Sequence, residues 1–238
     1  MSQVRSLSPA SMPIFKTKNE DFFKKWAPEM AYVLGFFTAD GNMIRNRRGA
    51  HFIEFQITDK DLLEDIKNAF KSNHKISIRE RSFPEKTIYR LQIGSKEIFN
   101  DLLRLGLTPN KSRTIKLPFV PPKYFSDFVR GYFDGDGCIS YGIYNRKDRK
   151  SKNCLFGSRF TSGSKVFLES LLKRFRDNTI IEGGFIYEKN RGFDLVLSTN
   201  DTKKLFKFMC SNTKNSLFLN RKYDKFCKGL KLLENHIL

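Results

Sequence analysis

The sequence predicts an α+β protein built from two copies of one αββαββα unit. Residues 32–41, "YVLGFFTADG", and residues 128–137, "FVRGYFDGDG", both run through apolar and small residues into Asp-Gly, and they are offset by 96 positions. Each is followed by stretches in which apolar and polar residues alternate, which is the period of a β-strand. Amphipathic helical segments follow these strands in the same order in both halves, so the pattern indicates an internal duplication. A chain of 238 residues is long enough for two such units.

In the first half, the apolar run from Glu29 to Ala39 predicts a buried helix, and Pro28 suits its first turn. A short helix is also predicted to begin before it, in "NEDFFKKWAPEM". The elements expected after it are a strand pair with a turn at Arg48-Gly49 (42–58), an amphipathic helix (59–70), two alternating strands (74–83 and 87–94) and a helix (95–107).

A Pro-rich segment, "KLPFVPPK", predicts a linker, after which the series restarts. We expect a helix (124–137), two strands (138–150 and 153–162), a helix (164–175), a hairpin (183–199) and a helix (201–210). The predicted organisation is a loose N-terminal segment over 1–17, a first repeat over 18–117 and a second repeat over 118–238.

The charge of the chain favours a polyanionic partner. Lys and Arg number 44 against 25 Asp and Glu, a net charge of +19, and the pI is near 9.8. Nucleic acid is the commonest partner for such a chain, although a solvated basic surface is the alternative. In "HKISIRERSF", Lys75, Ser77, Arg79 and Arg81 share one strand face, so that face could lie along phosphates. With no membrane-spanning run and no secretory core, an intracellular protein is expected, in a cytoplasm, mitochondrion or chloroplast.

The repeated helix raises an electrostatic conflict. Gly35 and Ala39, like Gly131 and Gly135, are four residues apart, and small residues at this spacing let two helices approach closely. Asp40 and Asp136 follow these small faces, at helix C-termini where the helix dipole is already negative. If the helices cross there, two carboxylates meet, and a hard cation such as Mg²⁺ would relieve the repulsion. A tight helix crossing alone would explain the small residues but not the carboxylates.

Other metal and phosphate motifs do not fit. "DGDGCISY" begins like a calcium loop, but Cys138 and Ile139 stand where Asp or Asn and then Gly are required. The four cysteines form no Cys-x-x-Cys pair, so a zinc site or a disulfide framework is not expected.

The two Asp-Gly helices resemble the paired signature helices of the LAGLIDADG homing endonucleases, in their single-chain, two-repeat form. The resemblance covers about residues 20 to 235. It implies that the signature helices pack at the interface of two pseudo-symmetric halves and that a saddle of antiparallel sheets faces DNA. Asp40 and Asp136 would bind two or three Mg²⁺ ions, which Mn²⁺ could replace, and each would serve one strand of a duplex.

The resemblance also implies a polar and a basic residue around the metals. These correspond to Gln56 and Lys111 in the first repeat. In the second repeat they correspond to Thr161, where "SRFTSGS" departs from the Gln pattern, and Lys222. "LTPNKS" and "LNRKY" place the two lysines opposite each other, and Asp134 is expected to buttress its helix end.

The expected activity is that of a Mg²⁺-dependent endonuclease, acting as a monomer on a long, pseudo-palindromic or asymmetric duplex target. The expected DNA contacts are the basic residues of the strands and their turns: Arg45, Arg47, Lys75, Arg79, Arg81, Arg90, Arg146, Lys147, Arg159 and Lys189. Two alternatives keep the fold, namely an intron maturase that binds RNA and a DNA-binding regulator without catalysis. An intein-embedded enzyme is disfavoured because "ENHIL" lacks a His-Asn junction.

Overall fold

The computed structural model describes residues 15–80, 86–145, 152–210 and 217–237. The first series consists of α1 (Pro28–Asp40), β1 (Asn42–Arg45), β2 (His51–Ile57), α2 (Lys60–Ala69), β3 (Ile76–Arg79), β4 (Ile88–Gly94) and α3 (Lys96–Arg104). The second consists of α4 (Phe125–Asp136), β5 (Gly137–Asn145), β6 (Lys152–Ser162), α5 (Lys165–Asp177), β7 (Phe185–Lys189), β8 (Gly192–Leu197) and α6 (Thr199–Cys210). Two short 3₁₀ turns, Lys111–Arg113 and Pro122–Tyr124, lie between the series, and α7 (Asn220–Ile237) ends the chain.

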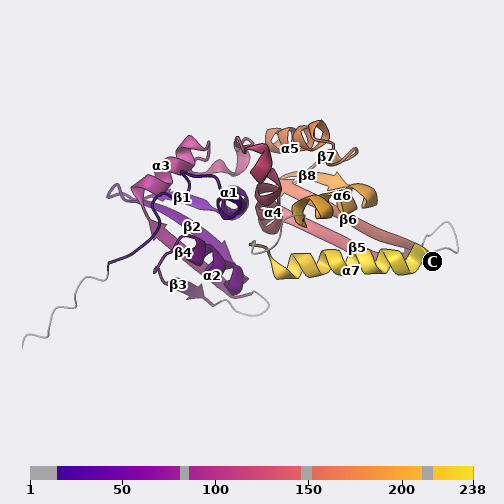
Figure 1. The fold of residues 1–238 in the computed structure, drawn as a ribbon, viewed down its shortest axis with the longest axis horizontal. Coiled ribbons are helices and arrows are strands. Elements are labelled where there is room, and N and C mark those ends of the chain that lie inside the picture. Colours follow the sequence, from indigo (N-terminus) through magenta and orange to yellow (C-terminus); the bar gives the residue numbers. More distant parts are fainter. Residues whose placement is uncertain (1–14, 81–85, 146–151, 211–216, 238) are drawn as a thin grey trace, which may run out of the picture.

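Each series folds into one four-stranded antiparallel sheet. The strand orders are β1-β2-β4-β3 and β5-β6-β8-β7, so the second sheet repeats the topology of the first. The two sheets lie on opposite sides of the central pair α1 and α4 (Figure 1). The predicted α+β fold of two αββαββα repeats is confirmed.

The central helices touch along their glycines. A Cβ atom on Gly35 would lie 2.9 Å from the carbonyl carbon of Phe128, and one on Gly131 would lie 2.8 Å from that of Tyr32. Both pairs obey the same 96-residue offset, because Tyr32 corresponds to Phe128 as Gly35 does to Gly131. Only residues without side chains allow backbones to approach this closely. The helix crossing is therefore pseudo-symmetric: each residue in this contact on α1 is matched by the residue 96 positions later on α4.

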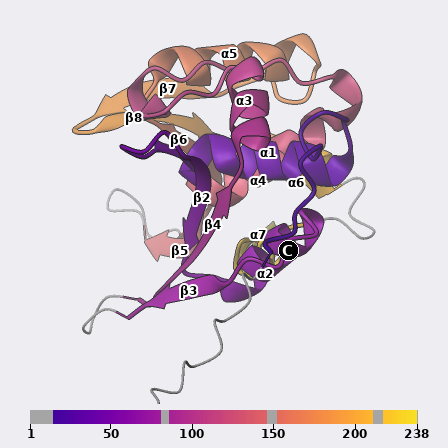
Figure 2. The same cartoon turned by 90° about the vertical axis from the view of Figure 1, so that its left-hand side faces the viewer.

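Each sheet has one face covered by helices and one open face, as the turned view in Figure 2 also shows for the first repeat. In β2, Ile53, Phe55 and Ile57 are buried in the core, whereas Gln56 points the other way and is exposed. In β6, Phe156 and Phe160 are buried, while Leu155 and Arg159 alternate with them and are exposed. The alternation in the sequence thus sorts the side chains into a core layer and an open layer.

Two local predictions need correction. The residues before α1 form a turn over 20–24 and not a helix, and Phe22 and Phe23 from this turn stack on Phe70 at the end of α2. The 18-residue helix α7 was not predicted from the sequence. It packs along β5 and β6 (Figure 1), with Phe226 and Leu233 buried against them.

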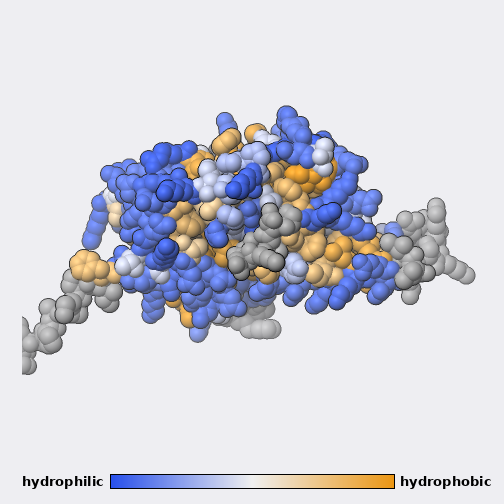
Figure 3. All heavy atoms as spheres, viewed as in Figure 1, coloured by the Kyte–Doolittle hydropathy of each residue, from blue (hydrophilic) through white to orange (hydrophobic). Residues whose placement is uncertain are grey.

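The molecular surface fits a basic, hydrophilic chain. Hydrophilic residues predominate on the face drawn in Figure 3. Among the described helices, none combines the length and the apolar character needed to cross a membrane.

Candidate catalytic site

The helix crossing brings the two predicted carboxylates together. Asp40 and Asp136 are the last residues of α1 and α4, and a Cβ atom on Gly135 would lie 3.3 Å from the Asp40 Oδ2 atom. Asp136 is half-buried, whereas Asp40 remains open to solvent on one side. The surrounding protein nevertheless raises the pKa of Asp40 by desolvation, against the opposing effect of Lys222 and Lys111. Burial, and then repulsion from Asp40, raise the pKa of Asp136 to about 7.

A buried lysine holds the C-terminus of each central helix. Lys111 Nζ donates a hydrogen bond to the carbonyl oxygen of Gly41 and lies 5.3 Å from the centre of the Phe37 ring. Lys222 Nζ donates to the carbonyl oxygens of Phe133 and Asp134, both at 2.7 Å, and lies 5.6 Å from the Phe133 ring. A cation at this end of a helix is stabilised by the helix dipole and satisfies otherwise unpaired carbonyls.

The two lysines share the main features of their electrostatic environment, although Asp134 and Arg221 act on Lys222 alone. Burial lowers the pKa of each to about 8, and both Asp40 and Asp136 oppose that shift. The sequence match between Lys111 and Lys222 therefore corresponds to equivalent places in the fold. Asn110, which precedes Lys111 and has a left-handed backbone with φ of 56°, turns the chain back toward α1.

Asp134 supports the second helix end, as the sequence predicted. Its Oδ2 atom accepts hydrogen bonds from Tyr32 Oη at 2.7 Å and from the Leu219 amide at 2.8 Å. Burial raises the pKa of Asp134, against the opposing effect of the Tyr32 hydrogen bond. Because Leu219 lies just before α7, this carboxyl group fixes the start of the helix that carries Lys222.

Strand register places Gln56 and Thr161 at equivalent positions. The pairing of β1 with β2 starts at Asn42 and Glu54, and that of β5 with β6 starts at Gly137 and Phe160, so Gln56 and Thr161 both lie just beyond the paired residues, at the end of the strand where the helix meets the sheet. Gln56 Nε2 donates to Glu54 Oε1 at 2.6 Å. Thr161 Oγ1 donates to Asp194 Oδ1, also at 2.6 Å.

These two acceptors, Glu54 and Asp194, are functional candidates that the sequence reasoning missed. Both are almost fully buried, with relative exposures of 3% and 2%. Glu54 Oε2 accepts from Arg90 Nε at 2.5 Å, and Asp194 Oδ2 lies 3.7 Å from Arg159 Nε. A carboxylate in the middle of a strand that contains no other acidic residue and no Lys or Arg was the signal in the sequence that could have revealed them.

The two ion pairs are the same pair with the charges exchanged. Arg90 faces Gln56 across the sheet, and Asp194 faces Thr161. Two residues before Gln56 stands Glu54, and two residues before Thr161 stands Arg159. In the first repeat the acidic residue is on β2 and the basic residue is on β4. In the second repeat the basic residue is on β6, which corresponds to β2, and the acidic residue is on β8.

The donor set at the helix ends fits a hard divalent cation. Carboxylate and carbonyl oxygens are the ligands that Mg²⁺ prefers, and Mg²⁺ keeps several waters or substrate oxygens. Among the described residues, no group of three or more His, Cys, Asp or Glu side chains could enclose an ion. A pocket of about 320 Å³, lined by Asp40, Asn42, Asn110 and Lys111, adjoins the pair on one side. Two converging carboxylates beside open space suit an ion that is shared with a substrate.

The predicted DNA-binding residues fall into three groups. Arg90, Arg159 and Lys189 lie on the open faces, each beside Glu54 or Asp194, and Arg79 lies on the open face of β3. Lys75 and Arg47 are exposed just outside the strands, whereas Arg45 alternates with Ile44 and so shares the helix-covered side of Met43, at the strand end. Arg81, Arg146 and Lys147 are outside the described residues.

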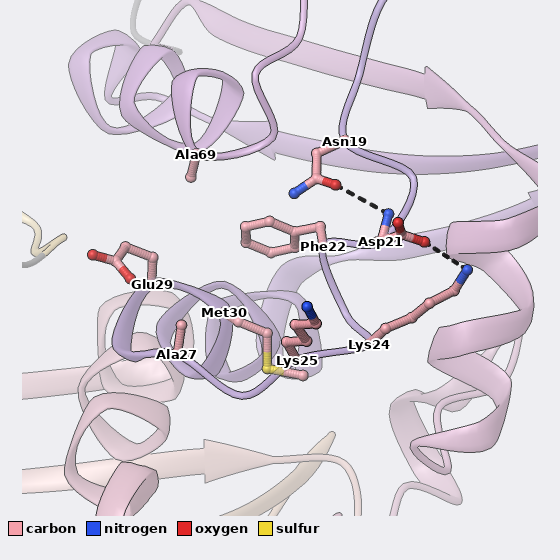
Figure 4. Close-up of a pocket in the computed structure, with 9 residues that line it drawn as sticks. All are labelled: Asn19, Asp21, Phe22, Lys24, Lys25, Ala27, Glu29, Met30 and Ala69. Atoms are coloured by element: carbon pink, nitrogen blue, oxygen red, sulfur yellow. Dashed lines mark hydrogen bonds and ion pairs between the residues drawn. The ribbon is translucent and has the colours of Figure 1, made fainter.

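A larger hollow of about 610 Å³ lies at the opposite end of α1 (Figure 4). Phe22 and Met30 line it, and the carboxylate of Asp21 pairs with Lys24 Nζ at 2.7 Å. Its two acids, Asp21 and Glu29, are both exposed, so this hollow lacks the partly buried, converging carboxylates found at the paired helix ends.

The fold and the paired helix ends define a class: a two-repeat α+β protein joined through a glycine-mediated helix crossing with a carboxylate at each helix end. Residues 27–112 match the family model of the LAGLIDADG-like domain. The chain contains a LAGLIDADG-like domain and has the fold of the single-chain LAGLIDADG homing endonucleases.

Solved structures of that fold cover nearly the whole chain. I-LtrWI bound to target DNA has a TM-score of 0.58 at 15% identity and covers 91% of this chain and 92% of its own. I-AabMI bound to uncleaved DNA has a TM-score of 0.59 at 16% identity, with 89% and 92% covered. I-SmaMI bound to cleaved DNA has a TM-score of 0.58 at 17% identity, with 89% and 91% covered.

A curated relative covers part of the chain. The uncharacterized protein MJ0398 of Methanocaldococcus jannaschii is 28% identical over 141 residues, which are 58% of this chain and 48% of the relative. The chain thus matches about half the length of this relative.

Proposed function

We propose that this protein is a site-specific endonuclease that hydrolyses one phosphodiester bond in each strand of duplex DNA, with a divalent metal ion as cofactor. The observation that supports this most strongly is the pair Asp40 and Asp136, each beside a buried lysine at the end of a pseudo-symmetric helix. The strands of a duplex are related by a two-fold axis. A two-fold pair of carboxylates can therefore address one scissile phosphate each, and a single chain supplies both.

The open faces of the two sheets are the proposed DNA-binding surface. They continue outward from Asp40 and Asp136, because β1 and β5 begin directly after the helix ends. Arg79, Arg159 and Lys189 lie on these faces, and the net charge of +19 attracts the phosphate backbone. Structures with the same fold, I-LtrWI, I-AabMI and I-SmaMI, are bound to DNA, which supports a DNA partner for this chain.

Asp40 and Asp136 would hold Mg²⁺, with water and phosphate oxygens completing its coordination. When bound, the ion would polarise a water molecule and stabilise charge on the phosphoryl and leaving oxygens. Lys111 and Lys222, whose pKa values burial lowers to about 8, exchange protons near neutral pH. In hydrolysis, a water molecule gives up one proton as its oxygen bonds to phosphorus, the bond from phosphorus to one sugar oxygen breaks, and that sugar oxygen takes up a proton. A lysine of this pKa suits such proton transfer.

Gln56 and Thr161 are proposed to position water or phosphate beside the carboxylates. Their hydrogen bonds to Glu54 and Asp194 restrict their rotamers. A side chain that is already oriented needs less reorganisation when substrate binds.

The test uses Asp40→Asn and Asp136→Asn. A randomised duplex library is incubated with the parent protein and Mg²⁺, and the cut ends are sequenced to recover a target. Binding of that target is then measured by gel shift in Ca²⁺, and cutting by a time course in Mg²⁺. Each variant is expected to lose double-strand cleavage and to retain binding, because Asn keeps the shape but removes the anion.

The matched control is Asp177→Asn, which removes one exposed carboxylate from α5, far along the chain from the helix ends. It should cut like the parent. Full cutting by either folded Asn variant would contradict the assignment of that residue. A parent that binds duplex DNA but never cuts it would indicate a regulator, and a clear preference for structured RNA would indicate a maturase.

A further inference from the structure

The open faces of the two sheets differ in chemistry although they are built on the same plan. In each sheet, cross-strand rows run outward from the carboxylate. The row nearest the helix end contains Gln56, Arg90 and Ser77 in the first sheet, and Thr161, Asp194 and Tyr187 in the second. Both of these inner rows are polar.

The next row outward shows the contrast. In the first sheet it contains Asn42, Glu54 and Gln92, all of which carry hydrogen-bonding groups. In the second sheet the equivalent row contains Cys138, Arg159, Val196 and Phe185. The two amides, Asn42 and Gln92, are thus replaced by Cys138 and Val196, and the acid Glu54 is replaced by Arg159.

The apolar side chains of the second sheet are accessible. Phe185 is 61% exposed, Leu155 47% and Tyr187 40%. With Val196 they line a hollow of about 560 Å³ above Gly157, where no side chain fills the sheet surface. On the first sheet the apolar residues of the open face are Ile44 and Phe52, one row further out, and Ile88, which pairs with Arg79, and all three are half-buried.

We infer that the second sheet recognises thymine methyl groups through Phe185 and Val196 of this row and through Leu155, two rows further out. The row of the first sheet that is equivalent to Phe185 and Val196 recognises bases by hydrogen bonds. This inference rests on the proposed function and names the kind of target. It follows from continuity, because Val196 and Phe185 share a row with Arg159, and this row lies next to the row of Thr161 on the face that begins at Asp136. In the major groove the 5-methyl group of thymine is the apolar feature of a base pair, while Asn and Gln suit adenine.

Pseudo-symmetry supplies the internal control for a test. Base pairs at equal distances from the cleavage centre face equivalent rows of the two sheets. The target is recovered from a randomised duplex library by binding in Ca²⁺, so that cutting is not required. Thymines in one half-site are then replaced by deoxyuridine, which lacks only the methyl group, and affinity is measured by gel shift.

We expect deoxyuridine in the half-site of the second repeat to weaken binding about fourfold for each methyl buried, the equivalent of about one methylene of apolar burial. The same replacement at the equivalent positions of the first half-site should change affinity by less than twofold. Phe185→Ser and Leu155→Ser should remove the sensitivity in the second half-site, and Phe52→Ser should not. Melting temperatures near that of the parent establish that each variant is folded.

Equal sensitivity of the two half-sites, or a recovered second half-site without thymine at these positions, would overturn the inference and leave the endonuclease proposal intact. Failure to bind any duplex would overturn both. If the apolar row instead joins two copies of the chain, the parent will dimerise without DNA and Phe185→Ser will make it monomeric, which would also overturn the inference.

Discussion

Gly35→Ala should separate the two central helices. The added Cβ atom would lie 2.9 Å from the carbonyl carbon of Phe128 and from the amide nitrogen of Tyr132, and closer still to the Phe128 oxygen. Van der Waals contact between such atoms begins at about 3.5 Å, so the helices must move apart by about 1 Å. Backbone atoms cannot rotate away as a side chain would. The overpacking cost is therefore at the upper end of about 1–3 kcal/mol.

Alanine offsets part of that cost, because it favours a helix over glycine by about 1 kcal/mol. A net loss of about 2 kcal/mol lowers the melting temperature of a chain of this size by about 4–8 °C. Catalysis should suffer more than stability, since Asp40 and Asp136 end the displaced helices and a shift of about 1 Å at reacting groups can cost about 100-fold.

The assays are thermal unfolding and the Mg²⁺ cleavage rate on the recovered target. Gly131→Ala should match Gly35→Ala, because its Cβ atom would meet the Tyr32 carbonyl in the same way. The double variant should cost less than the sum of the two, since one separation accommodates both methyl groups. Gly142→Ala is the control for thermal unfolding, because its added Cβ atom has no neighbour within 4 Å among the described residues. Parent-like melting and cutting by Gly35→Ala would refute this account of the interface.

Three further predictions follow from the site. Lys222→Met leaves three helix-end carbonyls without their donor and should lower the free energy of unfolding by about 1–3 kcal/mol. The variant should also fail to cut one strand, so that nicked product accumulates on a gel. Clean double-strand cutting by the folded variant would exclude the proposed role. In EDTA the parent should lose stability as pH rises from 4 to 7, because the pKa of Asp136 is about 7 when folded against an ordinary 3.8, and the unfolded chain therefore gives up this proton first. In denaturant melts Asp136→Asn should show a smaller decline than the parent, with the remainder due to Asp40 and Asp134, whose pKa values burial also raises. A pH profile of Asp136→Asn identical to that of the parent would count against the close carboxylate pair. Raising salt from 50 to 200 mM should weaken duplex binding by about 10³–10⁵ if six to ten phosphates are contacted, and a flat plot of log affinity against log salt would remove the electrostatic contribution.

The sequence determined the plan of the molecule because that plan is periodic. The 96-residue offset identified the two helices, their glycines and their terminal carboxylates, and alternation of polar and apolar residues identified both sheets. Even the match of Lys111 to Lys222 gave equivalent places in the fold. These features repeat in a fixed order, so they can be recognised without knowing which residues touch.

Helix α7 was missed although its signal was present. Phe226, Leu230 and Leu233 recur at helical spacing, and Phe226 and Leu233 are buried. The many lysines around them masked the pattern. In addition, the first repeat has no helix after Lys111 that corresponds to α7, so the internal comparison gave no guide.

What only the tertiary structure decided is the set of partners that each polar side chain has. Lys111 and Lys222 donate hydrogen bonds to carbonyl oxygens 70 and 89 residues away in the sequence. Glu54 and Asp194 are buried and form ion pairs with arginine side chains from neighbouring strands. The exchange of charge between these two pairs leaves no repeat in the sequence, because an acid in one half aligns with a base in the other. Hydrophobic periodicity specifies which face of an element is buried, but the energy of a buried charge depends on groups that only folding brings within a few ångströms.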